Sequence, residues 1–347
     1  MRARNTVFTL QALLAALFFG ASAPLSKLLL GDVPPVLMAA FLYLGSGTGI
    51  SLIKLSQRLT SNPQEAGIRR PDVKWLAGAI ISGGILAPIV LMISLQNTPA
   101  STASLLLNFE GVGTTLIALF FFRESVSRRA LAAIFVITLA GIFLSTNFAS
   151  GFGLSLGALG VILACVLWGV DNNFTRNISA KDPLTIVAWK GLVAGTFSLF
   201  LGLSLGQGLP TLTAILSILL LGFISYGFST MLFIYSMRGL GAARTSALYG
   251  TAPLAGVLLS FMIFRDPITL LLIFAAALMA AGALLLANEE HAHFHIHMPV
   301  VHEHRHTHDE FHEHDTTTLA HSHEHEHPRT EHEHGHMPDI HHRHEDQ

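Results

Sequence analysis

The sequence predicts an all-α membrane protein of ten transmembrane helices, arranged as two inverted five-helix repeats and followed by a disordered histidine-rich tail. Three observations lead to this prediction. The body of the chain is unusually poor in charge, its apolar runs are long enough to cross a bilayer, and its two halves share short motifs. All 20 histidines lie at or after His291, which separates the polar tail from the apolar body.

The composition indicates that lipid is the main solvent of the body. Of the 347 residues, 51% are hydrophobic and only 12% are charged, and the mean hydropathy is +0.54. A soluble domain carries about 25% charged residues. We therefore expect the lipid bilayer as the principal partner, and no nucleic acid.

Ten runs have the length that a spanning helix requires, which is roughly 20 mainly apolar residues. Continuous apolar runs exclude a closed barrel, whose strands alternate between apolar and polar positions. The ten runs are 7–30, 35–55, 75–95, 100–122, 130–146, 155–174, 184–205, 214–237, 245–264 and 269–287.

The distribution of basic residues predicts the orientation, because cytoplasmic loops are enriched in Lys and Arg. With the N-terminus inside, the outer side keeps only Lys27 and Arg265. An even number of spans then places both termini in the cytoplasm, in a bacterial-type inner (plasma) membrane. The inner side collects Arg2, Arg4, Lys54, Arg58, Arg69, Arg70, Lys74, Arg123, Arg128, Arg129, Arg176, Lys181, Arg238 and Arg244.

The N-terminal segment has an alternative interpretation as a secretory signal, since two arginines and an apolar run precede Ala21-Ser22-Ala23. The apolar run continues past that site to Leu30, and the segment has a counterpart later in the chain. We therefore expect it to be retained as the first spanning helix.

Short motifs recur between the two halves. Phe122-Arg123-Glu124 returns as Phe264-Arg265-Asp266, and Phe19-Gly20 followed by Lys27 returns as Trp168-Gly169 followed by Arg176. This predicts two units, residues 1–146 and 155–288, with the tail at 289–347. Because each unit has an odd number of spans, the second enters the membrane from the opposite side. Inverted repeats are typical of transporters, whose sites lie near the midplane between the halves.

These segments resemble the EamA-type unit of the drug/metabolite transporter superfamily over residues 7–288. The similarity lies in FFGASAPLSK, in LNFEGVGTTLIALFFFRESVSRRALAAIFVITLAGIFL and in YGTAPLAGVLLSFMIFRDPITLLLIFAAALMAAGALLLA. The chain departs from the family pattern at Asp266, where Glu is usual, and at Glu110, in a stretch that is usually apolar. The resemblance implies ten helices and transport of small metabolites, often export. It also implies that Lys27 and Arg176 are gate or anchor residues.

Glu110 is the most unusual residue of the body. It lies about ten residues into its helix, which corresponds to ~15 Å and so to the middle of the bilayer. An ionisable group there costs at least ~2.5–3.5 kcal/mol and needs a reason. It could couple transport to protons or contact a cationic substrate, or it could be a neutral carboxyl bonded to a neighbouring helix.

A second polar group flanks the predicted turn at residues 176–183. Asp171 and Lys190 lie at similar depth in an antiparallel hairpin, so they could form an ion pair that closes the inner mouth of a cavity, although Lys190 could also extend to the cytoplasm. Aromatic residues, including Trp189, could form the walls of a site. The candidate pathway residues are Asn108, Glu110, Trp168, Asp171, Asn172, Asn173, Lys190 and Tyr249.

The tail repeats His-x-His with Glu or Asp often between the histidines. In an extended chain, residues i and i+2 share one side, so imidazoles can converge on one ion. Neutral imidazole suits Zn, Ni, Co or Cu, and we expect the tail to bind such an ion. The candidate ligands are His291, His293, His295, His297, His302, His304, His306, His308, His312, His314, His321, His323, His325, His327, His332, His334, His336, His341, His342 and His344.

The sequence favours a secondary transporter, driven by a gradient or working by facilitated flow, since it contains no G-x-x-x-x-G-K-[ST] motif. It predicts a small-molecule substrate such as an amino acid, no required cofactor and no enzymatic activity. One alternative is transport of Ni, Co, Zn or a metal chelate, against which the body offers no histidine. A second alternative is a membrane-tethered metal sensor without transport.

Overall fold

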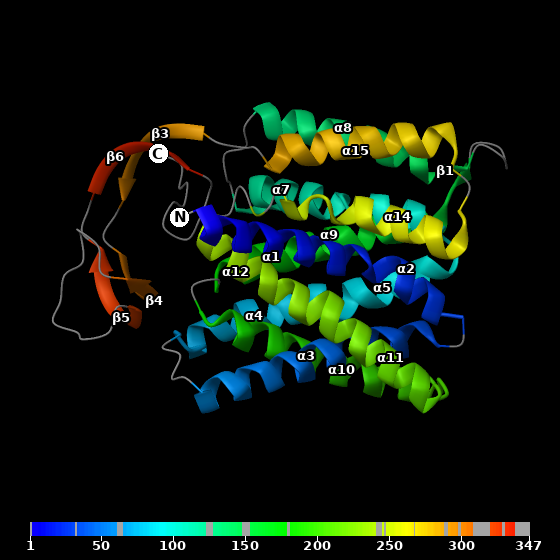
Figure 1. Ribbon diagram of the computed structural model, residues 1–347, viewed down its shortest axis with the longest axis horizontal. Coiled ribbons are helices and arrows are strands. Elements are labelled where there is room, and N and C mark those ends of the chain that lie inside the picture. The colour runs from blue at the N-terminus through cyan, green and yellow to red at the C-terminus, as the bar shows by residue number, and fades with distance from the viewer. Residues whose placement is uncertain are drawn as a thin grey trace.

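The computed structural model shows a bundle of helices followed by paired strands (Figure 1). For strands β3 to β6 it describes the backbone only. The described residues are 2–31, 33–60, 65–122, 128–147, 153–178, 181–240, 245, 248–266, 268–287, 291–297, 300–307, 320–327 and 330–336.

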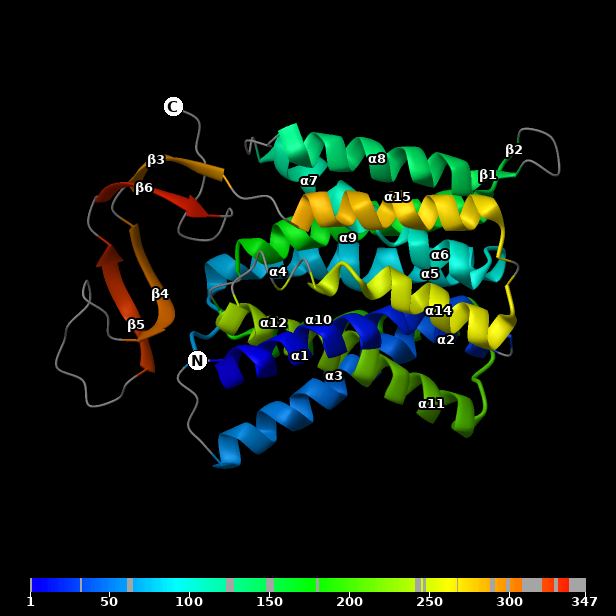
Figure 2. The ribbon, with the colours of Figure 1, turned by 45° about the horizontal axis from the view of Figure 1, so that its top comes forward.

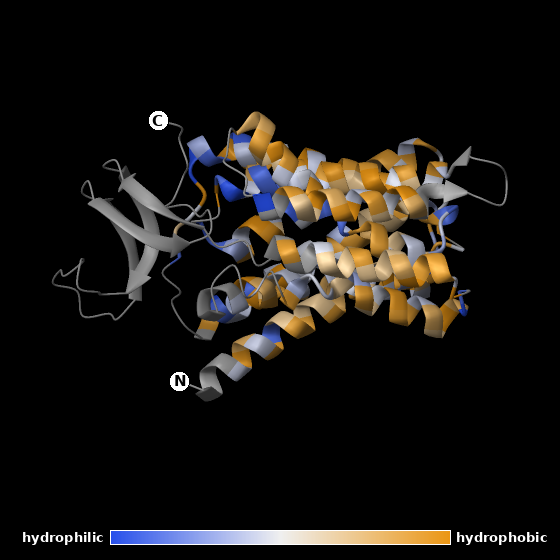
Figure 3. Cartoon of the chain, turned by 90° about the horizontal axis from the view of Figure 1, so that it is seen from above, coloured by the Kyte–Doolittle hydropathy of each residue, from blue (hydrophilic) through white to orange (hydrophobic). Residues whose placement is uncertain are grey.

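Seven helices in the described part of the chain are long and apolar enough to cross a membrane. They are Thr6–Leu29, Pro35–Leu59, Arg70–Gln96, Ala100–Phe121, Leu156–Arg176, Pro183–Ser204 and Leu212–Ser236. Three shorter apolar helices cover Leu131–Phe143, Ala252–Phe264 and Leu270–Gly282. These ten segments overlap the ten apolar runs of the sequence, and apolar residues cover the length of the bundle (Figure 3). The chain is therefore a multi-pass membrane protein.

The first half begins with α1 and α2, which follow each other closely, and ends with α8. Its elements are α1 Arg2–Gly20, α2 Ser22–Leu29, α3 Pro35–Thr60, η1 Arg70–Asp72, α4 Val73–Ala79, η2 Ile80–Leu86, α5 Ala87–Gln96, α6 Ala100–Leu106, α7 Phe109–Phe121 and α8 Arg128–Ser145. A short antiparallel pair, β1 Thr146–Asn147 and β2 Gly153–Leu154, leads into the second half.

The second half begins at α9, where the Ser155 side chain accepts a hydrogen bond from the Ala158 N–H group. Such N-caps satisfy free backbone donors at helix starts, and Asp182 and Thr211 do the same for α10 and α11. The elements are α9 Leu156–Arg176, α10 Pro183–Ser204, α11 Leu212–Gly222, η3 Phe223–Phe228, α12 Ser229–Leu240, α14 Ala252–Phe264 and α15 Leu270–Ala287.

Helices of the two halves pack against each other throughout the bundle. α3 packs along α10, α7 along α9, α1 along α12 and α14, and α8 along α15 (Figure 2). Buried apolar side chains from both halves, such as Leu42, Met92, Leu106 and Ile218, form a shared core. Large apolar side chains such as Phe121 and Leu156 lie exposed on the outside, where lipid would cover them.

The tail differs from the prediction of disorder, because four of its segments are strands. β3 His291–His297 pairs with β6 Thr330–His336, and β4 Val300–Thr307 pairs with β5 Ala320–His327, in both cases antiparallel. The alternation of histidine with other residues has the period of a strand, and this pattern explains why an extended pairing is available. The His-x-His repeat was evident in the sequence, but the pairing of strands was not predicted from it.

Candidate functional site

Several spanning helices are interrupted close to the centre of the bundle. α1 and α2 meet at Ala21, and Leu107 and Asn108 separate α6 from α7. Two further helices contain π-helical segments, η2 between α4 and α5 and η3 between α11 and α12. Pro88, in the first turn of α5, lacks an N–H group for the carbonyl four residues earlier, which accounts for the irregular backbone of η2. Such segments occur frequently at functional sites.

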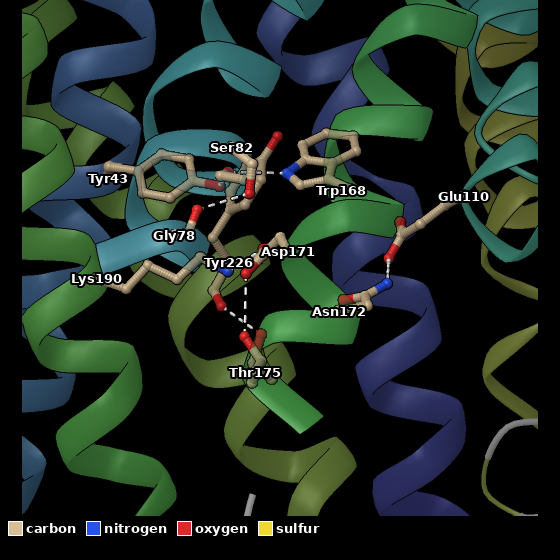
Figure 4. Close-up of polar contacts among 12 residues, drawn as sticks. Tyr43, Gly78, Ser82, Glu110, Trp168, Asp171, Asn172, Thr175, Lys190 and Tyr226 are labelled. Atoms are coloured by element: carbon tan, nitrogen blue, oxygen red, sulfur yellow. Dashed lines mark hydrogen bonds and ion pairs between the residues drawn. The ribbon is translucent and has the colours of Figure 1, made fainter. Parts of the chain in front are cut away.

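The η2 segment presents the carbonyl oxygen of Gly83 to two side chains. The Tyr43 hydroxyl donates to it at 2.5 Å and the Trp168 indole Nε1 donates at 3.0 Å (Figure 4). The three residues come from α3, η2 and α9. A side chain at position 83 would collide with the Asp171 carboxylate, so only glycine allows this approach.

Asp171 and Lys190 form the ion pair that the hairpin geometry predicted. The Lys190 ammonium group contacts Asp171 Oδ2, and the Thr175 hydroxyl donates to Asp171 Oδ1 at 3.0 Å. The Asp171 residue is only 2% exposed, so it is enclosed between α9, α10 and η2. Its role as a gate remains a prediction.

Glu110 lies on the other side of α9. Asn172 donates from Nδ2 to Glu110 Oε1 at 2.9 Å and to the Thr114 hydroxyl at 3.1 Å (Figure 4). Asn173 donates to the backbone carbonyls of Thr114 and Gly169, at 3.0 and 2.8 Å. The structure therefore joins α7 to α9 through a carboxyl–amide contact, with no ion pair at Glu110 among the described residues.

Aromatic rings from both halves of the chain contact one another close to these polar groups. The Tyr226 ring on η3 lies 5.6 Å from that of Tyr43 and 6.2 Å from that of Phe19, measured between centroids. Phe19 also contacts Trp168 at 6.5 Å and Tyr249 at 5.5 Å. The cluster Phe19, Tyr43, Trp168, Tyr226 and Tyr249, here called the aromatic cluster, thus joins both halves of the chain.

Some buried polar groups near the interruptions make no hydrogen bond within the described residues. They include the hydroxyl groups of Tyr226 and Ser225 on η3 and that of Ser26 on α2. The Ser22 hydroxyl lies close to that of Tyr226 without satisfying it. A buried polar group without a partner carries a desolvation cost of about 1–3 kcal/mol, so these hydroxyl groups are suited to bind a polar ligand.

Lys27 lies in the last turn of α2, at one end of the bundle. Its ammonium group donates to the carbonyl of Leu95 at 2.7 Å and to that of Thr98. Nearby, Asp266 accepts from the backbone N–H and the hydroxyl group of Ser101, at 3.1 and 2.7 Å. The contacts of Lys27 and Asp266 thus hold the ends of α2, α5, α6 and α14 together at this end of the bundle.

An ion-pair cluster joins α3 to α10 at a different place. Lys54 contacts Asp182 Oδ2 at 2.6 Å and also the Thr185 hydroxyl. Burial alone would raise the pKa of Asp182, but hydrogen bonds from Lys54 and Thr185, with the Lys54 charge, outweigh it and lower the pKa. Lys181 lies 3.8 Å from Asp72 beside this cluster.

The remaining predicted residues fall into separate places. The Asn108 side chain donates to the Leu105 carbonyl at 3.2 Å at the α6–α7 interruption, and Arg176 is the last residue of α9. Trp189 is 54% exposed on α10, so it forms no wall of the site, contrary to expectation. An aromatic residue in an apolar helix carries no sequence signal for the side it faces.

Sequence reasoning missed Tyr43, Gly83 and Tyr226. A signal was present, because Ile81-Ser82-Gly83-Gly84 in η2 and Ile224-Ser225-Tyr226-Gly227 in η3 share the pattern Ile-Ser-x-Gly. The two segments also occupy corresponding places in the two halves, each in the helix that follows α3 or α10.

Among residues whose side chains the structure describes, no group of three or more His, Cys, Asp or Glu could hold a metal ion. For the tail, the described backbone includes fourteen of the candidate histidines, all on β3 to β6. The candidates His308, His312, His314, His341, His342 and His344 lie outside the described residues.

Interrupted spanning helices around a buried polar cluster define a membrane transporter by class. The sequence matches the EamA-like transporter family over residues 8–147 and again over 155–288. The chain belongs to the EamA-like transporter family.

Two further similarities agree with this assignment. An uncharacterized transporter of Methanothermobacter thermautotrophicus (strain ATCC 29096 / DSM 1053 / JCM 10044 / NBRC 100330 / Delta H) is 27% identical over 288 residues, which cover 78% of this chain and 83% of that protein. A protein of known crystal structure shares the fold with a TM-score of 0.59 at 22% identity, over 80% of this chain and 94% of that one.

Proposed function

We propose that the protein is a secondary transporter that exports small metabolites such as amino acids across a bacterial-type inner membrane. The observation that carries the proposal is the pair of polar contacts on either side of α9, Glu110–Asn172 and Asp171–Lys190. Charged and carboxyl groups are expensive in spanning helices and typically mark a substrate or ion pathway. The aromatic cluster beside them offers apolar contact area for a small organic substrate.

In this proposal, the three shorter apolar helices complete ten spans that form two inverted repeats. Gly20 and Gly169 support this arrangement, because they occupy corresponding positions in the shared motif. Gly20 packs against the backbone of Ala252 at the start of α14, and Gly169 packs against Gly113 and Thr114 on α7. Each half thus packs a glycine of its first helix against a helix of the other half.

Lys27 and Arg176 are the proposed gate residues at the two membrane faces, with Asp171 and Lys190 closing the inner mouth. The contacts of Lys27 with two carbonyl groups support a closed outer end. Both termini and the tail lie in the cytoplasm in this proposal, as the distribution of basic residues indicates.

Glu110 is the proposed proton-coupling residue, since it has a neutral amide partner rather than a cation among the described residues. We expect Glu110→Gln to abolish proton-driven uptake in proteoliposomes, whereas Glu110→Asp retains part of it. The readout is radiolabelled substrate accumulation under an imposed pH gradient, compared with counterflow without a gradient. Wild-type accumulation by Glu110→Gln would refute the coupling role.

The substrate is tested by a panel in proteoliposomes that compares amino acids with Ni²⁺, Zn²⁺ and Co²⁺. We expect amino acids or similar metabolites to compete for transport, and the metal ions to be inert. Metal uptake without metabolite transport would instead support the alternative of a metal or metal-chelate transporter. The composition of the tail favours that alternative, and the absence of histidine before His291 opposes it.

The tail in this proposal binds a transition-metal ion such as Zn, Ni, Co or Cu and adjusts transport to metal supply. The support is chemical, because imidazole nitrogen is a good ligand for these ions near neutral pH. Equilibrium dialysis of the full chain against one without residues 289–347 tests it. Equal metal contents of the two proteins would refute it, with or without transport activity.

A further inference from the structure

The two strand pairs of the tail follow one continuous register. His291 lies opposite His336 at one end, and His306 lies opposite His321 at the other. β4 and β5 lie between β3 and β6 in the chain and are called the inner pair. β3 and β6 are called the outer pair and lie closer to α15 (Figure 1). Residues 291–307 therefore run antiparallel to residues 320–336 wherever the structure describes both.

In this register histidine positions oppose histidine positions. The inner pair has three such matches, and the outer pair has three more. The matches are His302 with His325, His304 with His323, His306 with His321, His291 with His336, His293 with His334 and His295 with His332.

The intervening positions form the other face of each strand pair. In the inner pair Glu303 is opposite Glu324, and in the outer pair Phe294 is opposite Glu333. Directly opposed residues of antiparallel strands share a face, and residues i and i+2 of one strand do so too. Each strand pair thus has one face on which seven histidine positions gather, because His297 and His327 share the face of the other histidines on their strands.

The spacing of these positions suits a single ion. Opposed Cα atoms in an antiparallel pair are about 4.5–5.5 Å apart, and successive positions on one face are roughly 6.8 Å apart. Two neighbouring matches therefore bring four histidine positions close together on one face. Four nitrogen ligands complete the tetrahedral shell that Zn²⁺ prefers in closed sites.

We propose that each strand pair binds one tetrahedral divalent transition-metal ion through histidines of both strands, which gives the tail an inner and an outer metal site. This inference rests on the proposed metal binding of the tail and specifies its architecture. Because ligands come from both strands, the metal links segments that are far apart in the chain. The outer site lies directly after α15, so its occupancy restrains the chain where it leaves the bundle.

The test counts bound Zn²⁺ in the full-length protein in detergent, after dialysis at fixed free Zn²⁺. One variant replaces His302, His304 and His306 of β4 with Ala, a second replaces His321, His323 and His325 of β5, and a third replaces all six. The control replaces His308, His312 and His314, the same number of histidines outside the strand pairs.

We expect each of the three strand variants to lose the same single ion. Replacing the histidines of both strands should therefore release no more Zn²⁺ than replacing those of one strand. The control should retain both ions. If the six-residue variant loses twice as much as either three-residue variant, each strand binds alone and the inference is wrong, although the tail still binds metal. If the wild-type chain binds no more Zn²⁺ than a chain without residues 289–347, the proposed metal binding fails as well.

A second measurement tests the register itself. Glu303→Cys with Glu324→Cys places two thiols at opposed positions, and Glu303→Cys with Glu333→Cys places them in different strand pairs. With a mild oxidant such as diamide added to the metal-free protein, we expect faster disulfide formation in the first variant. Equal rates for the two variants would contradict the register. Cys165, fully buried in α9, serves as an unreactive background thiol.

Discussion

Asp171 and Glu110 are both carboxyl groups within spanning helices, yet their surroundings differ. Asp171 is 2% exposed and held by the Lys190 ammonium group and the Thr175 hydroxyl. Glu110, on α7, contacts the neutral amide of Asn172, which follows Asp171 on α9. A compensated charge suits a fixed contact between helices, whereas a carboxyl with a neutral partner is suited to gain and lose a proton. The comparison favours proton exchange at Glu110 and, at Asp171, a contact that stabilises the proposed closed inner mouth.

The largest expected effect follows from removing the cation of the fixed pair. Lys190→Met leaves the enclosed Asp171 carboxylate without compensation, and breaking a buried pair in this way costs about 3–5 kcal/mol. We expect a strongly lowered melting temperature in detergent. The double variant Asp171→Asn, Lys190→Met should recover most of the loss. An unchanged melting temperature for Lys190→Met would show that the Asp171–Lys190 ion pair does not stabilise the fold.

Gly83→Ala should have the next largest effect, because the added methyl group meets the Asp171 carboxylate. Overpacking of this kind costs about 1–3 kcal/mol. The matched control is Gly31→Ala, at a position where an added methyl group meets no atom within 4 Å. Thermal unfolding of both variants measures the difference, and equal stabilities would show that η2 can move aside without cost.

Glu110→Gln should change stability much less than Lys190→Met. The amide keeps the shape of the carboxyl and can still bond Asn172, so the change should be within about 1 kcal/mol, the size of one hydrogen bond. The same thermal unfolding assay measures it. A loss as large as that of Lys190→Met would place Glu110 among the architectural residues and weaken its proposed coupling role.

The smallest effect is expected at the Lys54–Asp182 pair, in which Asp182 precedes the α10 span and Lys54 lies near the end of the α3 span. Because the pKa of Asp182 is lowered in the folded protein, the carboxylate stabilises the fold above its unfolded pKa of about 3.9, and this contribution is lost as pH falls through the folded pKa. For a partly exposed pair it amounts to about 0.2–1 kcal/mol.

Asp182→Asn should therefore lower stability slightly at neutral pH and flatten its decline in acid. Unfolding curves at pH 7 and at pH 3 measure both effects. Asp72→Asn is the control, because Asp72 lies 3.8 Å from Lys181, whereas Asp182 lies 2.6 Å from Lys54. If the stability of Asp182→Asn declined more steeply in acid than that of the wild type, the predicted direction of the pH dependence would be wrong.

The spanning helices could be predicted from the sequence because lipid demands long apolar runs, and each expected run overlaps an apolar helix. Glu110, Asp171 and Lys190 were identifiable because charge is rare in such runs. The contact between Asp171 and Lys190 followed from their equal depth in one hairpin.

The aromatic cluster and the π-helical segments could not be predicted in the same way. Tyr43 and Tyr226 look like ordinary apolar-helix residues until packing shows which side of the helix they occupy. The π-helical backbone of η2 depends on how Pro88 and the neighbouring helices fit together. The strands of the tail were not predicted because the His-x-His alternation was interpreted as ligand spacing and not as a signal for strand pairing.

The two π-helical segments have a mechanical consequence for a helix that spans a membrane. Each turn closed by i→i+5 bonds contains one more residue than the i→i+4 turn requires. If this surplus moves along the helix, every residue that it passes turns by about 100° around the axis, while both ends of the helix stay where the bilayer holds them. Gly83 or Tyr226 can thus be turned toward or away from the bundle centre without any helix sliding across the membrane.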